Sequence, residues 1–296
     1  YYPKMIKIIQ LLDYTRRCIE MLKKNILFFL ILLFVDIFSV FPESLPEYLN
    51  GIAYYYMNME NYYGALFIRD EPFLYSNDGS KKKTFNYDIF EKHGIPFISI
   101  KNENIAETQL ILVNDDFIVL YRENEKTPYF IGQSQEGHGP WNMFEKIENI
   151  TSTSFLKEKT IDYKPENLLN YNLDSPWVEG VTGYGIGEKI TFESKRGMGL
   201  VIGIGYVSFE KPYLYEKNSR PKSVKLTLKD KNLSQVYELK DTPNPQTLLF
   251  PYGERYEGKV ELEILDVYKG VAWDDTCINF IQVINVVPPS MSDDED

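Results

Sequence analysis

The stretch that most constrains the fold is residues 260–287, near the C-terminal end of the sequence. Apolar residues alternate with glutamates from Val260 to Ile264, which is the period-two pattern of a strand with one buried face. A turn follows at Gly270, and residues 278–287 form an apolar run rich in β-branched side chains. Such a run is typical of a strand inside a β-sandwich. The stretch therefore predicts a strand, a loop and a second strand.

The loop between these two strands carries Trp273, Asp274 and Asp275. Loops of an all-β domain commonly form its binding surface, because the strands supply a rigid scaffold. An indole ring can stack on the face of a sugar, and nearby carboxylates can accept hydrogen bonds from its hydroxyls. Core packing is the open alternative for Trp273. Adjacent residues of an extended chain point to opposite sides, which argues against a cooperating acid–base pair at Asp274 and Asp275.

Composition argues against several classes of function. The chain of 296 residues carries a net charge of −11, whereas nucleic-acid binding needs clustered Lys and Arg, so we expect no nucleic-acid partner. The two cysteines, Cys18 and Cys277, and the two histidines, His93 and His138, are too few for a zinc site or a disulfide framework. We expect Cys277 to be a small buried residue and His138, between two glycines, to lie in a surface loop.

Residues 21–42 are expected to form a signal peptide. A short basic segment after Met21 precedes ten apolar residues at 26–35, which is the pattern of a secretory leader. Asp36 would be costly at the centre of a membrane span. A retained membrane anchor and a buried helix remain the alternatives, and residues 1–20 read as a possible upstream extension. We expect an exported protein, periplasmic, surface-bound or secreted, that meets a membrane only through this segment if it stays uncleaved.

Two β-rich domains are expected after the leader, so the predicted fold class is all-β. Residues 43–148 hold short strand-like segments separated by turns and predict a small β-rich domain. Residues 149–287 predict an eight-stranded jelly-roll sandwich, and residues 288–296 a solvated acidic tail. The strands expected in the first domain are residues 65–68, 97–100, 110–113 and 117–121, with a hairpin tip near 77–80. Those expected in the second are residues 150–154, 189–193, 199–206, 223–229, 236–239, 246–250, 260–265 and 278–287.

Ordered segments across residues 150–287 carry a family resemblance. They are Thr151-Ser-Thr-Ser154, Pro165-Glu-Asn-Leu168, Trp177-Val-Glu-Gly-Val-Thr-Gly-Tyr-Gly-Ile-Gly-Glu188, Tyr215-Glu-Lys-Asn-Ser-Arg-Pro-Lys222 and Trp273-Asp-Asp-Thr-Cys-Ile278. The domain resembles the NADase-type glycan-binding domain, a galactose-binding-like, discoidin-like jelly roll found beside bacterial toxins and in exported proteins. The resemblance implies carbohydrate binding without catalysis. It does not extend to a NAD-cleaving domain.

The sequence departs from that family at the positions of a structural calcium site. Related discoidin-like folds often place Asp-Gly in the loop before the tryptophan, where this chain has Asn170 and Tyr171, and a Glu in the last strand, where it has Phe280. Calcium prefers several oxygen ligands, including carboxylates. We therefore expect no cofactor, with a weakened structural calcium site as the open alternative.

The loops with the most aromatic and polar side chains predict a shallow glycan site at one end of the sandwich. The candidate ligand-binding residues are Tyr184, Tyr213, Tyr215, Arg220, Trp273, Asp274 and Asp275. Arg220 either binds an anionic sugar or makes a structural ion pair. Trp177 is expected in the core, and the glycine-rich loop at 183–187 lacks the spacing and following helix of a dinucleotide fingerprint.

We expect no catalytic residues and no metal ligands, hence not an enzyme. The predicted partner is a glycan or glycoconjugate. A protein-interaction or structural module of the cell envelope remains the alternative, because fold alone does not fix the ligand.

Overall fold

The computed structural model describes residues 52–57, 62–68, 73–75, 82–84, 86–101, 106–122, 129–132, 144–170, 172–253 and 255–285. The leader expected at 21–42, the extension at 1–20, the hairpin tip near 77–80, Cys18, His138 and the acidic tail lie outside these residues. Within the described part of the chain, no helix has the length and apolar character needed to cross a bilayer. Residues 50–296 form one compact unit.

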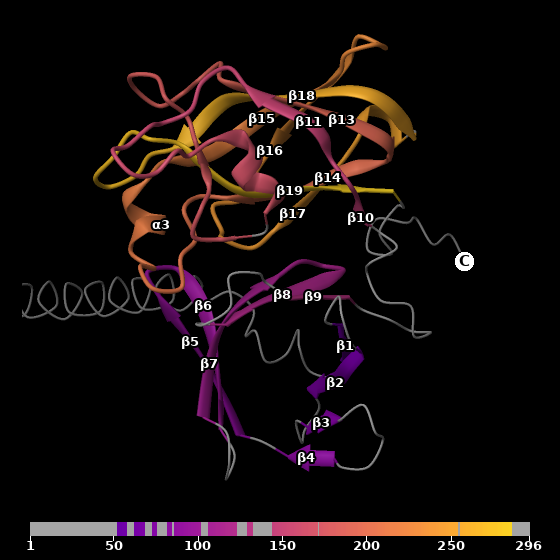
Figure 1. The fold of residues 1–296 in the computed structure, drawn as a ribbon, viewed down its shortest axis with the longest axis vertical. Coiled ribbons are helices and arrows are strands. Elements are labelled where there is room, and N and C mark those ends of the chain that lie inside the picture. The colour runs from indigo at the N-terminus through magenta and orange to yellow at the C-terminus, as the bar shows by residue number, and fades with distance from the viewer. Residues whose placement is uncertain are drawn as a thin grey trace, which may run out of the picture. The chain divides into compact units, whose positions relative to one another are not determined.

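The first strands of this unit form two antiparallel sheets (Figure 1). One has the order β1-β2-β3-β4 and the other β5-β6-β7-β8-β9. Their bounds are β1 Ile52–Met57, β2 Tyr62–Ile68, β3 Phe73–Tyr75, β4 Lys82–Thr84, β5 Asn86–Lys92, β6 Ile95–Lys101, β7 Ala106–Val113, β8 Phe117–Arg122 and β9 Tyr129–Gly132. The turn between β5 and β6 is His93-Gly94, with φ of 54° and 76°, as a tight two-residue hairpin turn requires.

The following strands form a sandwich of two antiparallel sheets. One sheet has the order β11-β13-β18-β15-β16, and the other the order β10-β19-β14-β17, with β12 also paired to β19. The bounds are β10 Phe144–Glu145, β11 Glu148–Ser152, β12 Trp177–Val178, β13 Lys189–Gly197, β14 Gly199–Ile204, β15 Arg220–Leu228, β16 Leu233–Glu238, β17 Gln246–Leu249, β18 Tyr256–Tyr268 and β19 Cys277–Ile284. Each strand expected in residues 149–287 coincides with one of these, so the predicted all-β class is confirmed. The described sandwich has ten strands where eight were expected, because the two-residue strands β10 and β12 are too short to show an alternating pattern.

Helical structure in the described residues is limited to short turns. The α-helix α3 spans Leu214–Lys217, and the 3-10 helices η2 and η3 span Pro165–Leu169 and Pro251–Gly253. The helix α3 lies in the connection from β14 to β15, which the sequence predicted only as a binding loop. It matters below because it presents side chains of the candidate site.

Strand β18 shows why the alternating pattern folds as it does. Val260 and Ile264 are buried in the sandwich core, with 0% and 1% of their surface exposed. On the opposite face, Glu261 pairs with Lys189 of β13 at 3.1 Å, and Glu263 pairs with Lys225 of β15 at 2.5 Å. Apolar burial therefore fixes the inner face, and cross-strand ion pairs line the outer one.

The core also contains two residues whose burial was predicted from the sequence. Trp177 is fully buried, and its indole N–H donates to the carbonyl of Ser154 at 3.1 Å. Cys277 is fully buried as well, and burial raises the pKa of its thiol. The predictions of a core Trp177 and a buried Cys277 are confirmed.

A second cluster of buried side chains joins the β5–β9 sheet to the sandwich. It includes Phe97 of β6, Leu110 of β7, Val201 of β14 and Phe280 of β19. Asn114, in the turn after β7, donates through its side chain to the carbonyl of Pro245 at 3.0 Å. Residues on both sides of position 148 thus share apolar and polar contacts, while the domain boundaries predicted from the sequence stay predictions.

Candidate functional site

Three connections meet at one end of the sandwich, and we call this region the loop end. They are the β12–β13 loop at 179–188, the β14–β15 connection at 205–219 and the β18–β19 loop at 269–276. Backbone and side-chain hydrogen bonds join them. The Trp273 amide donates to the carbonyl of Lys217 at 2.9 Å, and the Thr276 hydroxyl donates to the carbonyl of Tyr184 at 2.8 Å.

Two glycines allow these loops to pack closely. A Cβ atom on Gly270 would lie 2.3 Å from the carbonyl oxygen of Lys217, so only glycine lets the β18–β19 loop pass so close to α3. Gly185 has φ of 64°, and a Cβ there would lie 2.4 Å from Cγ of Glu179. The shape of the loop end therefore depends on backbone positions that other residues cannot occupy without displacement.

The exposed aromatic residues of the loop end surround one lysine. Tyr213, which precedes α3, and Trp273 are 36% and 41% exposed. The Lys217 Nζ atom lies 4.8 Å from the ring centroid of Tyr213 and 5.2 Å from that of Trp273. Both distances are within the range of cation–π attraction. We call these three residues the aromatic–lysine cluster.

The tip of the β5–β6 hairpin touches this cluster. The ring of His93 meets that of Tyr213 edge-on, with centroids 6.3 Å apart and planes at 82°. The His93 Nδ1 atom is 3.0 Å from Oε2 of Glu216 on α3. His93, which lies outside the sandwich, thus packs on α3, the helix that contains Lys217 and directly follows Tyr213.

Tyr184 lies in the β12–β13 loop, half-buried against the core. The Lys269 Nζ atom is 4.7 Å from its ring centroid. The loop end therefore holds a second contact between a lysine and a tyrosine ring.

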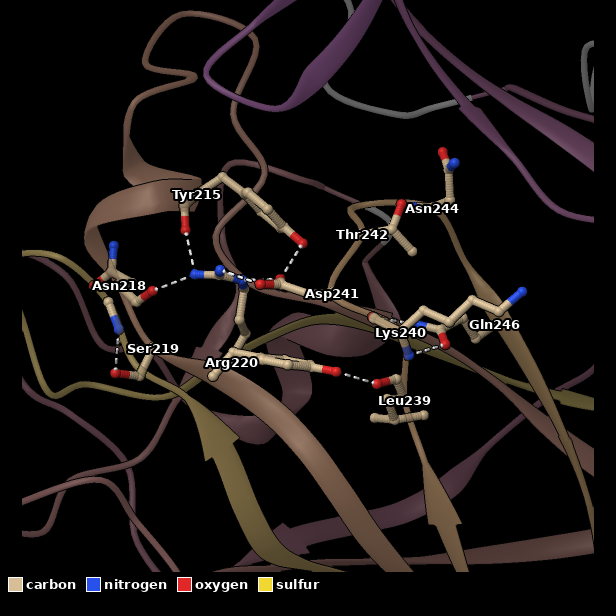
Figure 2. A network of polar contacts seen from close by, with 12 residues as sticks. Tyr215, Asn218, Ser219, Arg220, Leu239, Lys240, Asp241, Thr242, Asn244 and Gln246 are labelled. Atoms are coloured by element: carbon tan, nitrogen blue, oxygen red, sulfur yellow. Dashed lines mark hydrogen bonds and ion pairs between the residues drawn. The ribbon is translucent and has the colours of Figure 1, made fainter. Parts of the chain in front are cut away.

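Arg220 and Tyr215 lie inside the protein, beneath α3. The Arg220 side chain forms two hydrogen bonds with Asp241, from Nε to Oδ1 at 2.5 Å and from Nη2 to Oδ2 at 2.7 Å (Figure 2). Its Nη1 donates to the carbonyls of Tyr215 and Asn218 at 3.2 and 3.1 Å. The Tyr215 hydroxyl donates to Asp241 at 3.3 Å, and burial raises the pKa of Tyr215 well above its ordinary value.

This geometry favours the structural alternative for Arg220. Only 9% of Arg220 and 4% of Tyr215 are exposed, and the guanidinium charge is neutralised by Asp241. The two residues hold the carbonyls around α3, and they present little surface to a ligand. Five of the seven predicted site residues reach the surface of the loop end: Tyr184, Tyr213, Trp273, Asp274 and Asp275.

The two carboxylates after Trp273 have different environments. Asp274 is exposed, whereas Asp275 is half-buried. Burial, together with the nearby charge of Asp274, raises the pKa of Asp275. The Asp275 carbonyl accepts the amide of Ser219 at 2.9 Å, so this residue also helps fix the loop.

Glu179 is a buried residue of the candidate site that the sequence analysis missed. It is fully buried, and its carboxylate accepts the amides of Val181 at 2.8 Å and Thr276 at 3.4 Å. Burial raises its pKa to about 7, although the two amide hydrogen bonds act in the opposite direction. The sequence does contain an indication that Glu179 is buried. Glu179 is two residues after Trp177, and residues at that spacing in an extended chain share a face.

The positions related to the family's calcium site have other contacts here. Asn170 is exposed at the end of η2, and Phe280 is 1% exposed in the core. Asn172 accepts the amide of Asp174 at 3.1 Å, and Asp174 accepts the hydroxyl of Tyr121 at 2.9 Å. Among the described residues, no group of three or more His, Cys, Asp or Glu side chains is placed to hold a metal ion.

The sandwich that carries the loop end is similar to a known domain family. Residues 141–284 match the family model of the NAD glycohydrolase translocation F5/8 type C domain. The match confirms the predicted resemblance to the NADase-type, discoidin-like domain. No curated protein matches the chain significantly.

Several solved structures are similar to about half of the chain. The family 32 carbohydrate-binding module of NanJ from C. perfringens, in complex with galactose, is 10% identical over 47% of this chain and 93% of its own, with a TM-score of 0.34. The module CpGH89CBM32-5 from Clostridium perfringens, in complex with GalNAc-β-1,3-galactose, is 16% identical over 46% and 94%, with a TM-score of 0.35. A fucose binding module from Streptococcus pneumoniae is 14% identical over 47% and 92%, with a TM-score of 0.31.

Replacing Asp241 by Asn is expected to destabilise the protein, because Arg220 then keeps a buried charge without its anionic partner. We expect the free energy of unfolding to fall by about 2–3 kcal/mol, measured by denaturant titration. Asp266→Asn is the matched control. Asp266 pairs with Lys222, and both side chains are more than 40% exposed, so the loss is about 1 kcal/mol or less. Equal losses in the two variants would contradict the structural role of the Arg220–Asp241 pair.

Replacing Glu179 by Gln is expected to change the pH dependence of stability. Because the pKa of Glu179 rises from an ordinary 4.5 to about 7 on folding, the folded protein holds this proton more tightly than the unfolded chain. Its contribution to stability is present at low pH and is lost as pH rises to about 7. Between about pH 5 and 8, the unfolding free energy of the variant should gain about 2–3 kcal/mol relative to wild type. Parallel pH profiles of the two proteins would show that Glu179 is not held protonated.

Proposed function

We propose that the sandwich is a non-catalytic carbohydrate-binding module whose glycan site is the loop end. One observation carries this proposal. Tyr213 and Trp273, from two different connections, lie exposed around a shared lysine on loops that are held by backbone hydrogen bonds. Such rings offer flat apolar surface for the C–H faces of a sugar, next to carboxylates that accept hydrogen bonds from hydroxyls.

In this mechanism each surface residue has a defined role. Trp273 and Tyr213 stack on the sugar, and Asp274 accepts hydrogen bonds from its hydroxyls. Tyr184 and Asp275 border the site. Arg220 and Tyr215, which the sequence placed among the ligand-binding residues, act from below by fixing α3. Because the loops are already held in place, binding loses little free energy to ordering them.

The match of residues 141–284 to an F5/8 type C domain supports a binding role for the sandwich rather than a catalytic one. The acidic residues of the loop end also support binding rather than catalysis. Asp274 and Asp275 are adjacent in the chain, so their carboxylates do not face each other as an acid–base pair would. We propose no metal or cofactor at this site. Binding is therefore expected to survive a calcium chelator.

We further propose that the protein is exported to the periplasm, the cell surface or the medium. The basic segment and apolar run within residues 21–42 support this proposal. The first β-rich domain, residues 43–148, and the sandwich, residues 149–287, would then both be outside the cytoplasm. A glycan or glycoconjugate of that compartment is the partner.

A protein-interaction role in the envelope is the second candidate, and one observation favours it. The loop end exposes aliphatic side chains next to the aromatic ones, with Val271 81% exposed, Ile186 60% and Val181 42%. Clustered exposed apolar residues are common at protein interfaces. A protein partner would depend on these aliphatic residues, whereas a sugar would depend on the rings.

The test is a glycan-array screen of the purified full chain with and without chelator, followed by titration of the best ligand. Trp273→Ala is expected to weaken that binding about tenfold or more, because the variant loses a stacking surface. Val271→Ala is the control on the same loop, and we expect it to bind the glycan as wild type does. Unchanged binding in the double variant Trp273→Ala, Asp274→Ala would refute the site. A folded protein that binds no glycan would favour the interaction role instead.

A further inference from the structure

Lys217 is the cation that lies within the aromatic–lysine cluster. Arg220 is buried, and its charge is used by Asp241. Lys217 is half-buried between the rings of Tyr213 and Trp273. Within the part of the chain that the structure describes, no carboxylate forms an ion pair with its ammonium group.

The ammonium group of Lys217 therefore has hydrogen-bonding capacity that the protein leaves to water. An ammonium group has three N–H donors, and an aromatic face attracts the charge but is no substitute for an oxygen acceptor. Partial burial between two rings removes part of its hydration. An anionic oxygen supplied by a ligand would form a charge-assisted hydrogen bond at this position, stronger than one between neutral groups.

The acidic residues that adjoin the cluster in the sequence, Glu216, Asp274 and Asp275, form no ion pair with Lys217 in the described part of the chain. Glu216, the neighbour of Lys217 in α3, is turned to His93, with 3.0 Å between Oε2 and Nδ1. Asp275 is half-buried, and its backbone is bound to Ser219. The carboxylate of α3 that adjoins Lys217 is thus engaged by His93.

We infer that the glycan bound at the loop end is acidic, a sugar with a carboxylate or sulfate group that pairs with Lys217 while a sugar ring stacks on Trp273 or Tyr213. This inference rests on the proposed function and adds the class of ligand. Lys269, over the ring of Tyr184, repeats the combination of a cation and an aromatic ring in the same region.

Because the chain is acidic overall, a preference for acidic sugars has to arise from contacts within the site. With a net charge of −11, the protein does not attract anionic glycans over long distances. Any preference for an acidic sugar has to come from short-range contacts at the cluster. Removal of one lysine should then abolish the preference and leave the stacking contribution in place.

The experiment compares glycans that differ only in the acidic group. The full chain is titrated with lactose, sialyllactose and sulfolactose, and with the corresponding N-acetyllactosamine set. We expect at least one acidic member to bind about tenfold tighter than its neutral parent. The carboxylated and sulfated probes distinguish the two sources of negative charge.

The variants assign the preference to a residue. Lys217→Gln is expected to bind acidic and neutral members equally. The control Lys259→Gln removes an exposed lysine near the opposite end of β18 and should keep the preference. Thermal unfolding of both variants verifies that they are folded.

The outcomes separate this inference from the proposed function. Binding of neutral and acidic glycans with equal affinity by wild type would overturn the inference and leave the proposed function standing. A preference that persists in Lys217→Gln would overturn the assignment to Lys217. No binding of any glycan, here or on the array, would refute the proposed function and this inference with it.

Discussion

The loop end depends on one interaction, the pairing of the buried Arg220 with Asp241. Arg220 begins β15, and Asp241 lies in the connection from β16 to β17. An isolated charge at the position of Arg220 would cost several kcal/mol, so the guanidinium requires this partner. Its remaining donors bind carbonyls on both sides of Lys217. The position of α3, and with it the aromatic–lysine cluster, therefore follows from a charge pair that a ligand does not touch.

A second buried group, Glu179, organises the other side of the loop end. Its carboxyl group accepts amides from the β12–β13 loop and from the end of the β18–β19 loop, which lie far apart in the sequence. Gly185 packs directly against its side chain. Since burial raises the pKa of Glu179 to about 7, its protonation changes near neutral pH. One buried cation and one buried acid thus hold the loops, and Lys217 and Asp274 are the residues that we propose for recognition.

Much of the fold is predictable from the sequence, because burial imposes periodicity. The alternation along β18 and the apolar run of β19 each correspond to one strand, and the turn residues between them give the loop. The two tryptophans of the sandwich show the limit of this approach. Trp177 is in the core and Trp273 at the surface, yet the sequence left the position of Trp273 open, because an aromatic residue in a loop can pack either way.

The details of the site were harder to predict, because they depend on contacts between distant segments. Nothing local to Arg220 reveals that its partner is Asp241, since that pairing is set by how the two sheets place their connections. The same is true of Lys217, whose second ring comes from the β18–β19 loop, and of His93, which reaches Glu216 from another sheet. Sequence composition directed attention to these loops. It did not separate the residues that support the site from those that face the solvent.

The measurement that tests the central claim most directly is a nuclear magnetic resonance titration of the indole N–H signals with the glycan selected by the array. Trp273 and Trp177 serve as a pair in one molecule, since the first is exposed at the loop end and the second is fully buried. The chain has three tryptophans, and the variants Trp273→Phe and Trp141→Phe assign their indole signals. We predict that the Trp273 signal shifts on binding while the Trp177 signal stays in place. A glycan that binds without moving the Trp273 signal would contradict the account and place the site elsewhere.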